Sequence, residues 1–337
     1  MKRFFTILLT IGLFMTFNSQ IFAGDTAVCY NCPPMWADWA SQLRAIEENI
    51  GIKLPHDNKN SGQTLSQLIA EKSNPIADVA YYGVSFGIKA KESGVVSPYK
   101  PKYWNEIPDG LKDPNGNWFT IHSGTIGFFV NKDALDEMNV PVPSSWADLL
   151  KPEYKGMVGY LDPTSAFVGY ASAVAINMAF GGSLDNFDPG IKFLQKLKKN
   201  RPIVPKQTSY ARVISGEIPI LFDYDFNAYR GKYKDEVNVE FVIPTEGSIV
   251  VPYVMSLVKN SPNPTQGKAV LDFIMSDKGQ KVWANAFLRP VRAGVLSPEV
   301  AAKFLPAADY QRAKAIDYQK MASVQNIFRD RYLNEVR

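Results

Sequence analysis

The sequence predicts an α/β protein built from two lobes. Two series of alternating strands and helices indicate this class, one near residues 26–83 and one near residues 157–225. Alternation of this kind favours mostly parallel sheets that carry helices on their faces and ligand loops at the ends of the strands. The 337 residues are also enough for two lobes with separate cores.

The first residues carry the pattern of an export signal. Lys2 and Arg3 precede an apolar run from about Phe4 to Phe17, and the residues up to Ala23 fit a small-residue cleavage site. The run is short for a membrane span, which needs roughly 20 apolar residues. We therefore expect a cleaved signal peptide at residues 1–23 and a soluble exported protein, with a retained anchor as the alternative.

Composition excludes one class of partner. Hydrophobic residues make up 46% and charged residues 21% of the chain, as in an ordinary globular protein. Two of the 37 Lys and Arg residues lie in the expected signal peptide, which leaves 35 basic residues against 33 Asp and Glu residues. The mature chain is therefore nearly neutral. No basic stripe is present, so we expect no binding of nucleic acid.

The chain has two cysteines, Cys29 and Cys32. A Cys-x-x-Cys pair is typical of thioredoxin-like redox sites, but a structural disulfide or two buried thiols fit the same pattern. In an extended chain the two Cα atoms would be about 10 Å apart, beyond the limit of about 7 Å for a disulfide. A bond therefore needs a turn at Tyr30–Asn31. Nothing else resembles thioredoxin, so a structural disulfide is favoured, and the pairing stays open.

The first series, near residues 26–83, begins with a helix that has a clear apolar spacing. Trp36, Trp39, Leu43 and Ile46 recur at helical spacing, and Gly51 ends that helix. The expected order is a strand near 26–31, a helix at 35–50, a strand at 52–58, a helix at 61–73 capped by Ser61, and a strand at 77–83. The loops expected to face a ligand are residues 31–35, 60–64 and 81–84.

The rest of the chain follows the same plan. The second series is expected as a strand at 157–162, helices at 165–182 and 186–200, a strand at 201–205, a helix at 210–217 and a strand at 218–225. A strand at 251–260 and helices within 264–287 follow.

Three stretches together resemble one family. "GTIGFFVNKDALDEMNVPVPSSWADLLKPEYKGMVG", "YARVISGEIPILFDYD" and "SLVKNSPNPTQGKAVLDFIMSDKGQKVW" are similar, in this order, to the crossover, second-lobe and return segments of bacterial solute-binding proteins of ABC transporters. The likeness is to the branch labelled ferric-iron transport, which includes binders of sugar phosphates and phosphonates.

The resemblance implies a periplasmic binding protein of type II, with a ligand cleft between two lobes joined by two crossover strands. Lobe 1 would comprise residues 24–121 plus 251–337, and lobe 2 residues 122–250. It further implies a monomer in the periplasm that closes by hinge motion and delivers its solute to permease subunits in the inner membrane. No catalytic residue and no cofactor are expected.

The residues argue against iron. Iron binders of this branch carry adjacent tyrosines after the "GE" strand, whereas this chain has Phe226 and Asn227 there, or Tyr224 and Asp225 in a shifted register. The two histidines of the chain, His56 and His122, are not at a ligand spacing. Iron is therefore the alternative, and no metal site is expected.

Small polar residues at expected helix starts favour an anion. Thr164 and Ser165 open one helix, and Ser61 and Thr64 lie in the first turn of another. Free N–H groups at a helix N-terminus suit a phosphate, although plain N-capping explains the same residues. The "HSGT" segment, His122 to Thr125, adds further donors at the first crossover.

Acidic residues beside aromatic residues could bind the end of a ligand that does not carry the anionic group. Asp223, Asp225 and Glu246 are candidate acceptors for sugar hydroxyls or an ammonium group, and Tyr224 or Tyr229 for packing against a ring. These residues favour a sugar phosphate, with a phosphonate such as 2-aminoethylphosphonate next and a polyamine as a further alternative. The expected ligand-binding residues are Ser61, Thr64, Tyr82, His122, Ser123, Thr125, Thr164, Ser165, Tyr224, Asp225 and Glu246.

A different class, a secreted hydrolase using two carboxylates, also remains open, because the sequence gives no separation between the acids. It contains no GxSxG, HExxH, Walker A or dinucleotide fingerprint.

Overall fold

The computed structural model describes residues 25–206 and 209–337. The expected signal peptide at 1–23 lies outside the described residues. Within them, no helix is both long and apolar enough to cross a membrane.

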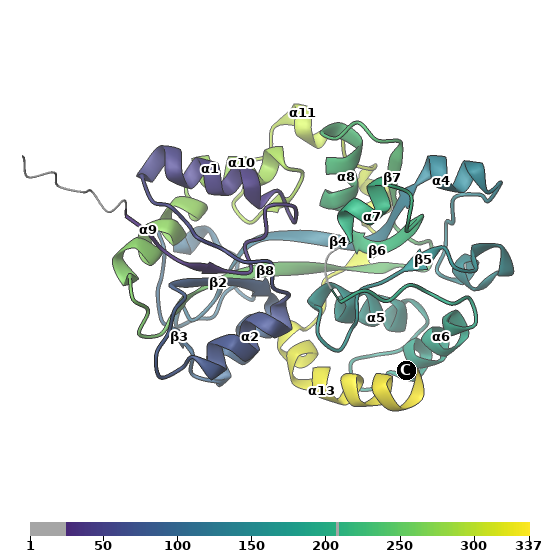
Figure 1. Cartoon of the computed structure of the whole chain (residues 1–337), viewed down its shortest axis with the longest axis horizontal. Helices are drawn as coiled ribbons and strands as arrows, with labels where there is room; N and C mark the ends of the chain where they lie inside the picture. Colours follow the sequence, from purple (N-terminus) through teal and green to yellow (C-terminus); the bar gives the residue numbers. More distant parts are fainter. Residues whose placement is uncertain (1–24, 207–208) are drawn as a thin grey trace, which may run out of the picture.

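Two long antiparallel strands, β4 (Phe119–Asn131) and β8 (Ser248–Val258), form the centre of the molecule (Figure 1). They pair from Phe119 opposite Met255 to Thr125 opposite Val250. In the first lobe β8 pairs with β2, and in the second lobe β4 pairs with β6, which gives the order β1-β2-β8-β4-β6-β5. Both long strands therefore pass from one lobe to the other.

The described sheet is mixed rather than mostly parallel, which corrects the expectation. β1–β2, β5–β6 and β10–β8 are parallel pairs, whereas every pairing of β4 is antiparallel. The reason is that each lobe receives a strand arriving from the other lobe. The shorter strands are β1 (Cys29–Tyr30), β2 (Val79–Gly83), β3 (Val96–Ser97), β5 (Val158–Gly159), β6 (Ile220–Tyr224), β7 (Val239–Val242), β9 (Arg289–Pro290) and β10 (Ala313–Lys314).

Helices cover both faces of this sheet (Figure 1). Those of the first lobe are α1 (Trp39–Ile50), α2 (Ser61–Ala70), α3 (Val84–Glu92), α9 (Pro264–Met275) and α10 (Asp277–Asn285), with the 3₁₀ helix η1 (Trp104–Glu106). Those of the second lobe are α4 (Lys132–Glu137), α5 (Phe167–Ala179), α6 (Asp188–Lys198), α7 (Tyr210–Ile214) and α8 (Asp225–Tyr233), with η2 (Ala147–Leu150) and η3 (Pro152–Tyr154). The chain ends in α11 (Pro298–Ala301), α12 (Ala307–Tyr310) and α13 (Tyr318–Glu335).

Several expected boundaries differ from the structure. α1 begins at Trp39 rather than residue 35, because Ala37 and Asp38 have φ of 51° and 49°, which no right-handed helix accepts. The cap of α2 is Asn60, whose side chain accepts from the N–H of Gln63, and not Ser61.

The expected strand at 52–58 is reduced to isolated bridges. Lys53 bridges to Thr26 and His56 to Cys29. Pro55 lies between the two bridges and has no N–H to donate to a continuous ladder.

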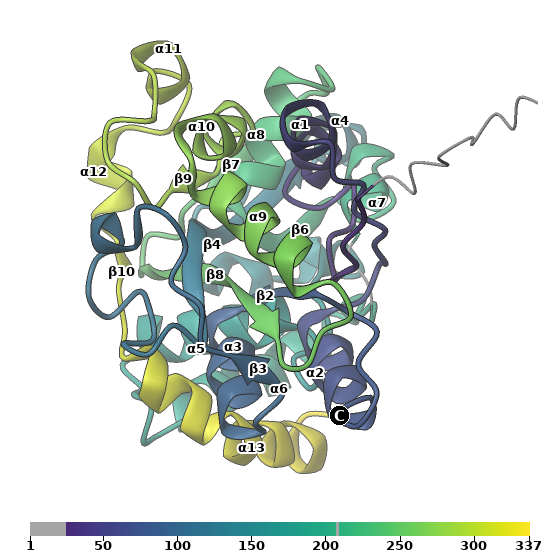
Figure 2. The same cartoon turned by 90° about the vertical axis from the view of Figure 1, so that its left-hand side faces the viewer.

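The C-terminal segment contacts both lobes (Figure 2). α13 packs along α3 of the first lobe. It also meets the second lobe, where the Tyr170 hydroxyl donates to the Met321 carbonyl at 2.7 Å and Arg331 pairs with Asp188 at 2.8 Å. The lobe boundaries given above stay a prediction.

Cys29 and Cys32 form a disulfide with their Cα atoms 6.0 Å apart. The required turn is present, because Asn31 has φ 65°. Both cysteines are buried. The disulfide therefore closes the loop that leads from β1 to Trp36.

Candidate functional site

The ends of β1, β2 and β6 and the start of α5 converge where the lobes meet. A cavity of about 50 Å³ remains there. Its lining residues are Asn31, Pro33, Trp36, Asn58, Lys59, Asn60, Ser61, Leu161, Ala166, Phe167, Val168 and Tyr253. Ligand pockets usually measure about 300–1,000 Å³. The structure is therefore a closed form, in which side chains fill most of the cleft.

One wall of the cleft is aromatic and crosses between lobes. Trp36 of the first lobe lies edge-on to Phe226 and Tyr224 of the second, with ring centroids 5.6 and 5.9 Å apart. Phe226 and Tyr224 are stacked on each other at 5.2 Å. Trp36 lies shortly after Cys32, so the disulfide helps to position the Trp36 ring against Phe226 and Tyr224.

The opposite wall is made by Phe167 at the start of α5. Its ring lies over Gly83, where a Cβ atom would be 1.7 Å from the Cδ1 atom of Phe167. It also lies edge-on to Tyr253, at 5.6 Å. Gly83 has ordinary extended geometry, so glycine is required there for space rather than for backbone conformation.

The floor consists of three rings in mutual contact. Tyr253 packs against both Tyr81 and His122, at centroid distances of 5.0 and 5.5 Å, and the rings of Tyr81 and His122 are 5.7 Å apart. The indole N–H of Trp36 donates to the Tyr81 hydroxyl at 3.3 Å, and that hydroxyl is 3.0 Å from His122 Nε2.

Burial fixes the charge of this floor. Desolvation lowers the pKa of His122 to about 3, so the imidazole is neutral at ordinary pH. Desolvation also raises the pKa of Tyr81, Tyr224 and Tyr253 well above the ordinary value, so their phenols stay protonated. The floor is therefore uncharged.

The helix starts are arranged differently from the expectation. Ser61 lines the cavity, and its Oγ accepts from the N–H of Gly83 at 3.2 Å. Thr64 is buried, and its hydroxyl donates to the Asn60 carbonyl at 2.9 Å. The N–H of Gly62 donates to the Ser165 carbonyl of the other lobe at 3.2 Å. Of the two predicted side chains on α2, the structure brings only Ser61 to the cavity.

Thr164 and Ser165 lie just outside the cavity. α5 begins at Phe167, later than expected, because the preceding residues turn around Asp162. The N–H and hydroxyl of Thr164 both donate to Asp162 Oδ1, at 2.9 and 2.6 Å. Instead, the first residues of the helix itself, Phe167 and Val168, line the cavity.

Asp225 is placed behind the aromatic wall. It is fully buried, and its Oδ1 accepts from the N–H groups of Thr125 and Phe226, both at 3.0 Å. The Tyr310 hydroxyl donates to its Oδ2 at 3.0 Å. The preceding acid, Asp223, is also buried, which raises its pKa to about 7.

Glu246 lies away from the cleft. Its carboxylate accepts from the N–H groups of Trp146 and Ala147, each at 3.0 Å, and so caps η2. Neither predicted acid is therefore brought to the cavity, and no carboxylate lines it among the described residues.

The remaining predicted residues are divided between floor and rear. Tyr224 and His122 form part of the wall and floor described above. Tyr82 is fully buried, and its hydroxyl has no partner among the described residues. Ser123 and Thr125 line a separate cavity of about 420 Å³ behind the wall.

Residues that the sequence reasoning missed make up much of the cavity. Trp36 and Phe167 were assigned to helices, and Tyr253 and Lys59 were not singled out. One signal was available for Trp36, since it directly follows the loop after β1. In the described residues no three His, Cys, Asp or Glu side chains form a group that could hold a metal.

Comparison with known proteins identifies the family. The model of the bacterial extracellular solute-binding proteins matches residues 74–324, well over half of the chain. The chain belongs to this family. A Haemophilus influenzae protein of uncharacterised function is 30% identical over 82% of this chain and 79% of its own length.

Other relatives carry named ligands. A periplasmic protein of Salmonella typhimurium named for 2-aminoethylphosphonate binding is 26% identical over 79% of this chain and 78% of its own length. The periplasmic binding protein AfuA of Actinobacillus pleuropneumoniae, solved with fructose 6-phosphate, has a TM-score of 0.78 at 23% identity, covering 93% of this chain and 98% of its own. Iron-bound HitA of Pseudomonas aeruginosa has a TM-score of 0.70 at 22% identity, covering 91% and 98%.

These findings confirm the expected family and the type II periplasmic binding protein fold. The chain is a solute-binding protein of an ABC importer, a class that works with permease subunits, and its relatives are binding proteins rather than enzymes.

Proposed function

We propose that this solute-binding protein captures a small phosphonate or phosphate ester that carries an ammonium group, for which 2-aminoethylphosphonate is the reference compound. The observation that supports this ligand is the lining of the cleft, which combines an aromatic box with Lys59 at its edge; no carboxylate of the described residues lines the cavity, although Asp57 pairs with Lys59 from outside it.

The aromatic box suits the ammonium end. Trp36, Phe167 and Tyr253 line the cavity from three sides. The faces of aromatic rings attract cations, most strongly when water is excluded. His122 at the floor is neutral, so it adds no repulsion.

The anionic end has its own partners at the edge of the cavity. Lys59 lines the cavity and its Nζ lies 4.3 Å from the centre of the Tyr30 ring. The first residues of α5 face the same space, and the N–H groups at the start of a helix of 13 residues attract anions.

This ligand replaces the expected preference for a sugar phosphate. That preference required Asp225 and Glu246 as acceptors for hydroxyls, and both carboxylates are occupied elsewhere by main-chain N–H groups. A polyamine such as spermidine has several ammonium groups, and this cleft offers them no free carboxylate, because no acid of the described residues lines it and Asp57 beside it is paired with Lys59. The Salmonella relative, at 26% identity, supports an aminophosphonate.

Calorimetry of the ligand-stripped protein tests the proposal. 2-Aminoethylphosphonate should bind, whereas ethylphosphonate, which lacks the ammonium group, and ethanolamine, which lacks the phosphonate, should bind more weakly. Glucose 6-phosphate, spermidine and ferric citrate complete the panel. Binding of spermidine alone, or equal binding of ethylphosphonate and 2-aminoethylphosphonate, would refute the proposal.

Variants assign the two ends. Trp36→Leu should weaken 2-aminoethylphosphonate by about 2- to 30-fold, the usual range for one cation–π contact, and Trp36→Phe by less. Lys59→Met should weaken the binding of both 2-aminoethylphosphonate and ethylphosphonate. Lys53→Met, an exposed lysine of the same lobe, is the matched control and should bind like the wild type.

We further propose that the protein is exported to the periplasm after cleavage at residue 23 and works there as a monomer. N-terminal sequencing of the protein from a periplasmic extract tests the cleavage, and light scattering tests the mass. An intact N-terminus or a stable dimer would contradict these proposals.

A further inference from the structure

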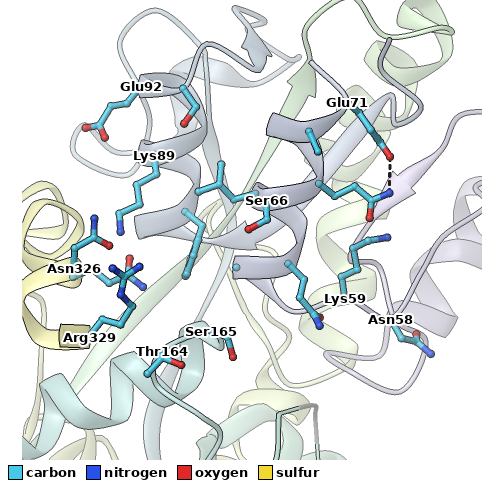
Figure 3. A pocket seen from close by; sticks show the side chains of 18 residues that line it. Asn58, Lys59, Ser66, Glu71, Lys89, Glu92, Thr164, Ser165, Asn326 and Arg329 are labelled. Atoms are coloured by element: carbon cyan, nitrogen blue, oxygen red, sulfur yellow. Dashed lines mark hydrogen bonds between the residues drawn. The ribbon is translucent and has the colours of Figure 1, made fainter. Parts of the chain in front are cut away.

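A second, larger depression lies beside the aromatic cavity. It is a groove of about 1,110 Å³ between α2, α3 and α13, bounded by Thr164 and Ser165 (Figure 3). The N–H···O contact between Gly62 and Ser165 lies between the groove and the cavity, and Gly62, Ser165 and Lys59 line the groove.

Two cations face each other at one end of this groove. Figure 3 shows the Lys89 side chain of α3 and the Arg329 side chain of α13 turned toward one another, with Asn326 beside them. No carboxylate of the described residues lies within 4.0 Å of the Lys89 amine, and Arg329 pairs only with its exposed neighbour Asp330 at 3.1 Å. The acids of the groove, Glu71 and Glu92, lie farther from this pair (Figure 3).

The pairing of like charges is unfavourable in the protein by itself. Lys89 is half-buried. Burial, and then the positive charge of Arg329, lower the pKa of Lys89 to about 8, while Glu92 acts in the opposite sense. The Lys89 amine lies 5.8 Å from the centre of the Phe86 ring, a cation–π contact, but none of the described carboxylates forms an ion pair with it.

The two cations come from different helices at the junction of the lobes. Lys89 is carried by α3 of the first lobe. Arg329 is carried by α13, which packs along α3 and is also bound to the second lobe, by Met321 to Tyr170 and by Arg331 to Asp188. The two positive charges and the Thr164–Ser165 turn of the second lobe therefore meet in one groove between the lobes.

We propose that this groove is a second anion site, in which a tetrahedral oxyanion, either free phosphate or the head group of a phosphonate, binds between Lys89 and Arg329 and favours the closed form. An anion at this point interacts with both cations and faces the Thr164–Ser165 turn of the second lobe, so its binding favours the form in which that turn closes the groove. The side-chain amide of Asn326 lies beside the two cations and can donate to a remaining oxygen of the anion (Figure 3). The inference does not depend on which solute occupies the aromatic cavity.

Calorimetry and a distance measurement test this site with inorganic phosphate as the probe. Spin labels at Glu47 on α1 and Lys232 on α8, both exposed, would report lobe closure from the opposite face. Phosphate should bind the wild type and shift the label distances toward the closed form. Lys89→Met and Arg329→Gln should each weaken phosphate by about tenfold or more, because each removes one charge-assisted partner. The matched controls Lys281→Met and Arg44→Gln remove the same charges from exposed positions on α10 and α1 and should change nothing.

A charge reversal gives an independent result. Arg329→Glu places a carboxylate opposite Lys89, so the closed form should be populated without phosphate and phosphate should no longer shift it. Trp36→Leu should weaken 2-aminoethylphosphonate and leave phosphate binding in the groove unchanged, which separates this site from the cleft. No phosphate binding by the wild type, equal weakening in the controls, or a phosphate-dependent closure that survives Arg329→Glu would overturn the proposal.

Discussion

One methyl group at Gly83 should prevent the lobes from closing. Gly83 ends β2 in the first lobe, and a Cβ atom there would lie 1.7 Å from Phe167 of the second lobe. Its φ of −64° and ψ of 150° are accessible to alanine, so the open form of Gly83→Ala meets no backbone strain. The substitution therefore acts on closure and not on the folding of either lobe.

The size of the effect follows from the overlap. A 1.7 Å approach cannot be tolerated, so the Phe167 ring must move, and overpacking of this kind costs about 1–3 kcal/mol. Since a ligand that needs the closed form loses affinity in proportion to the population of that form, the apparent affinity should fall by about 5- to 150-fold.

Calorimetry with 2-aminoethylphosphonate, together with small-angle scattering, measures this change. Gly83→Ala should bind weakly and show no compaction, while its melting temperature stays close to that of the wild type. Gly87→Ala is the contrasting control, because its Cβ would meet Val254 of the same lobe at 2.5 Å and should lower the melting temperature instead. Adding Phe167→Ala should restore the closure of Gly83→Ala, a coupling that a double-mutant cycle measures. Normal compaction of Gly83→Ala would refute the reasoning.

Three further predictions concern the disulfide, iron and pH. The double variant Cys29→Ser with Cys32→Ser should lower the free energy of unfolding by about 2 kcal/mol, as expected for so short a closed loop. It should also weaken the binding of 2-aminoethylphosphonate, because the disulfide helps to position Trp36. An unchanged affinity in calorimetry would show that the disulfide does not position Trp36. Titration with ferric citrate should give no tyrosinate-to-iron colour, since burial keeps the pKa of Tyr224 well above its ordinary value; a coloured complex lost in Tyr224→Phe would contradict this. Because burial lowers the pKa of His122 to about 3, its contribution to stability is present above about pH 6.5 and is lost as pH falls toward 3. In the wild type the free energy of unfolding should therefore decrease as the pH falls from about 6.5 toward 3, and His122→Gln should reduce this slope by up to about 1.4 kcal/mol per pH unit. Urea unfolding at a series of pH values measures the slope, with His56→Gln as the control. If His122→Gln and His56→Gln gave the same slope, His122 would not be the group responsible.

The sequence by itself determined the order of the elements and the family. β2 lies where the apolar run at 77–83 predicted it, and α2 begins at Ser61 as expected. These features depend on local periodicity and on turn residues, which a single stretch of chain contains. The absence of a tyrosine pair after the "GE" strand was also a property of one stretch.

Only the tertiary structure decided which polar groups face the ligand. Asp225 and Glu246 look like available acceptors in the sequence, but Asp225 is bound by the N–H of Thr125 and Glu246 by that of Trp146, each 100 residues away. Trp36 has the spacing of a core helix, yet the positive φ of Ala37 and Asp38 ends that pattern and leaves the ring in the cleft. Whether the strands pair parallel or antiparallel was also decided by the tertiary structure, because β4 and β8 each pass from one lobe into the other. A local pattern reports whether a side chain is buried, whereas its partner is set by contacts between distant segments, and these exist only once the lobes have folded against each other.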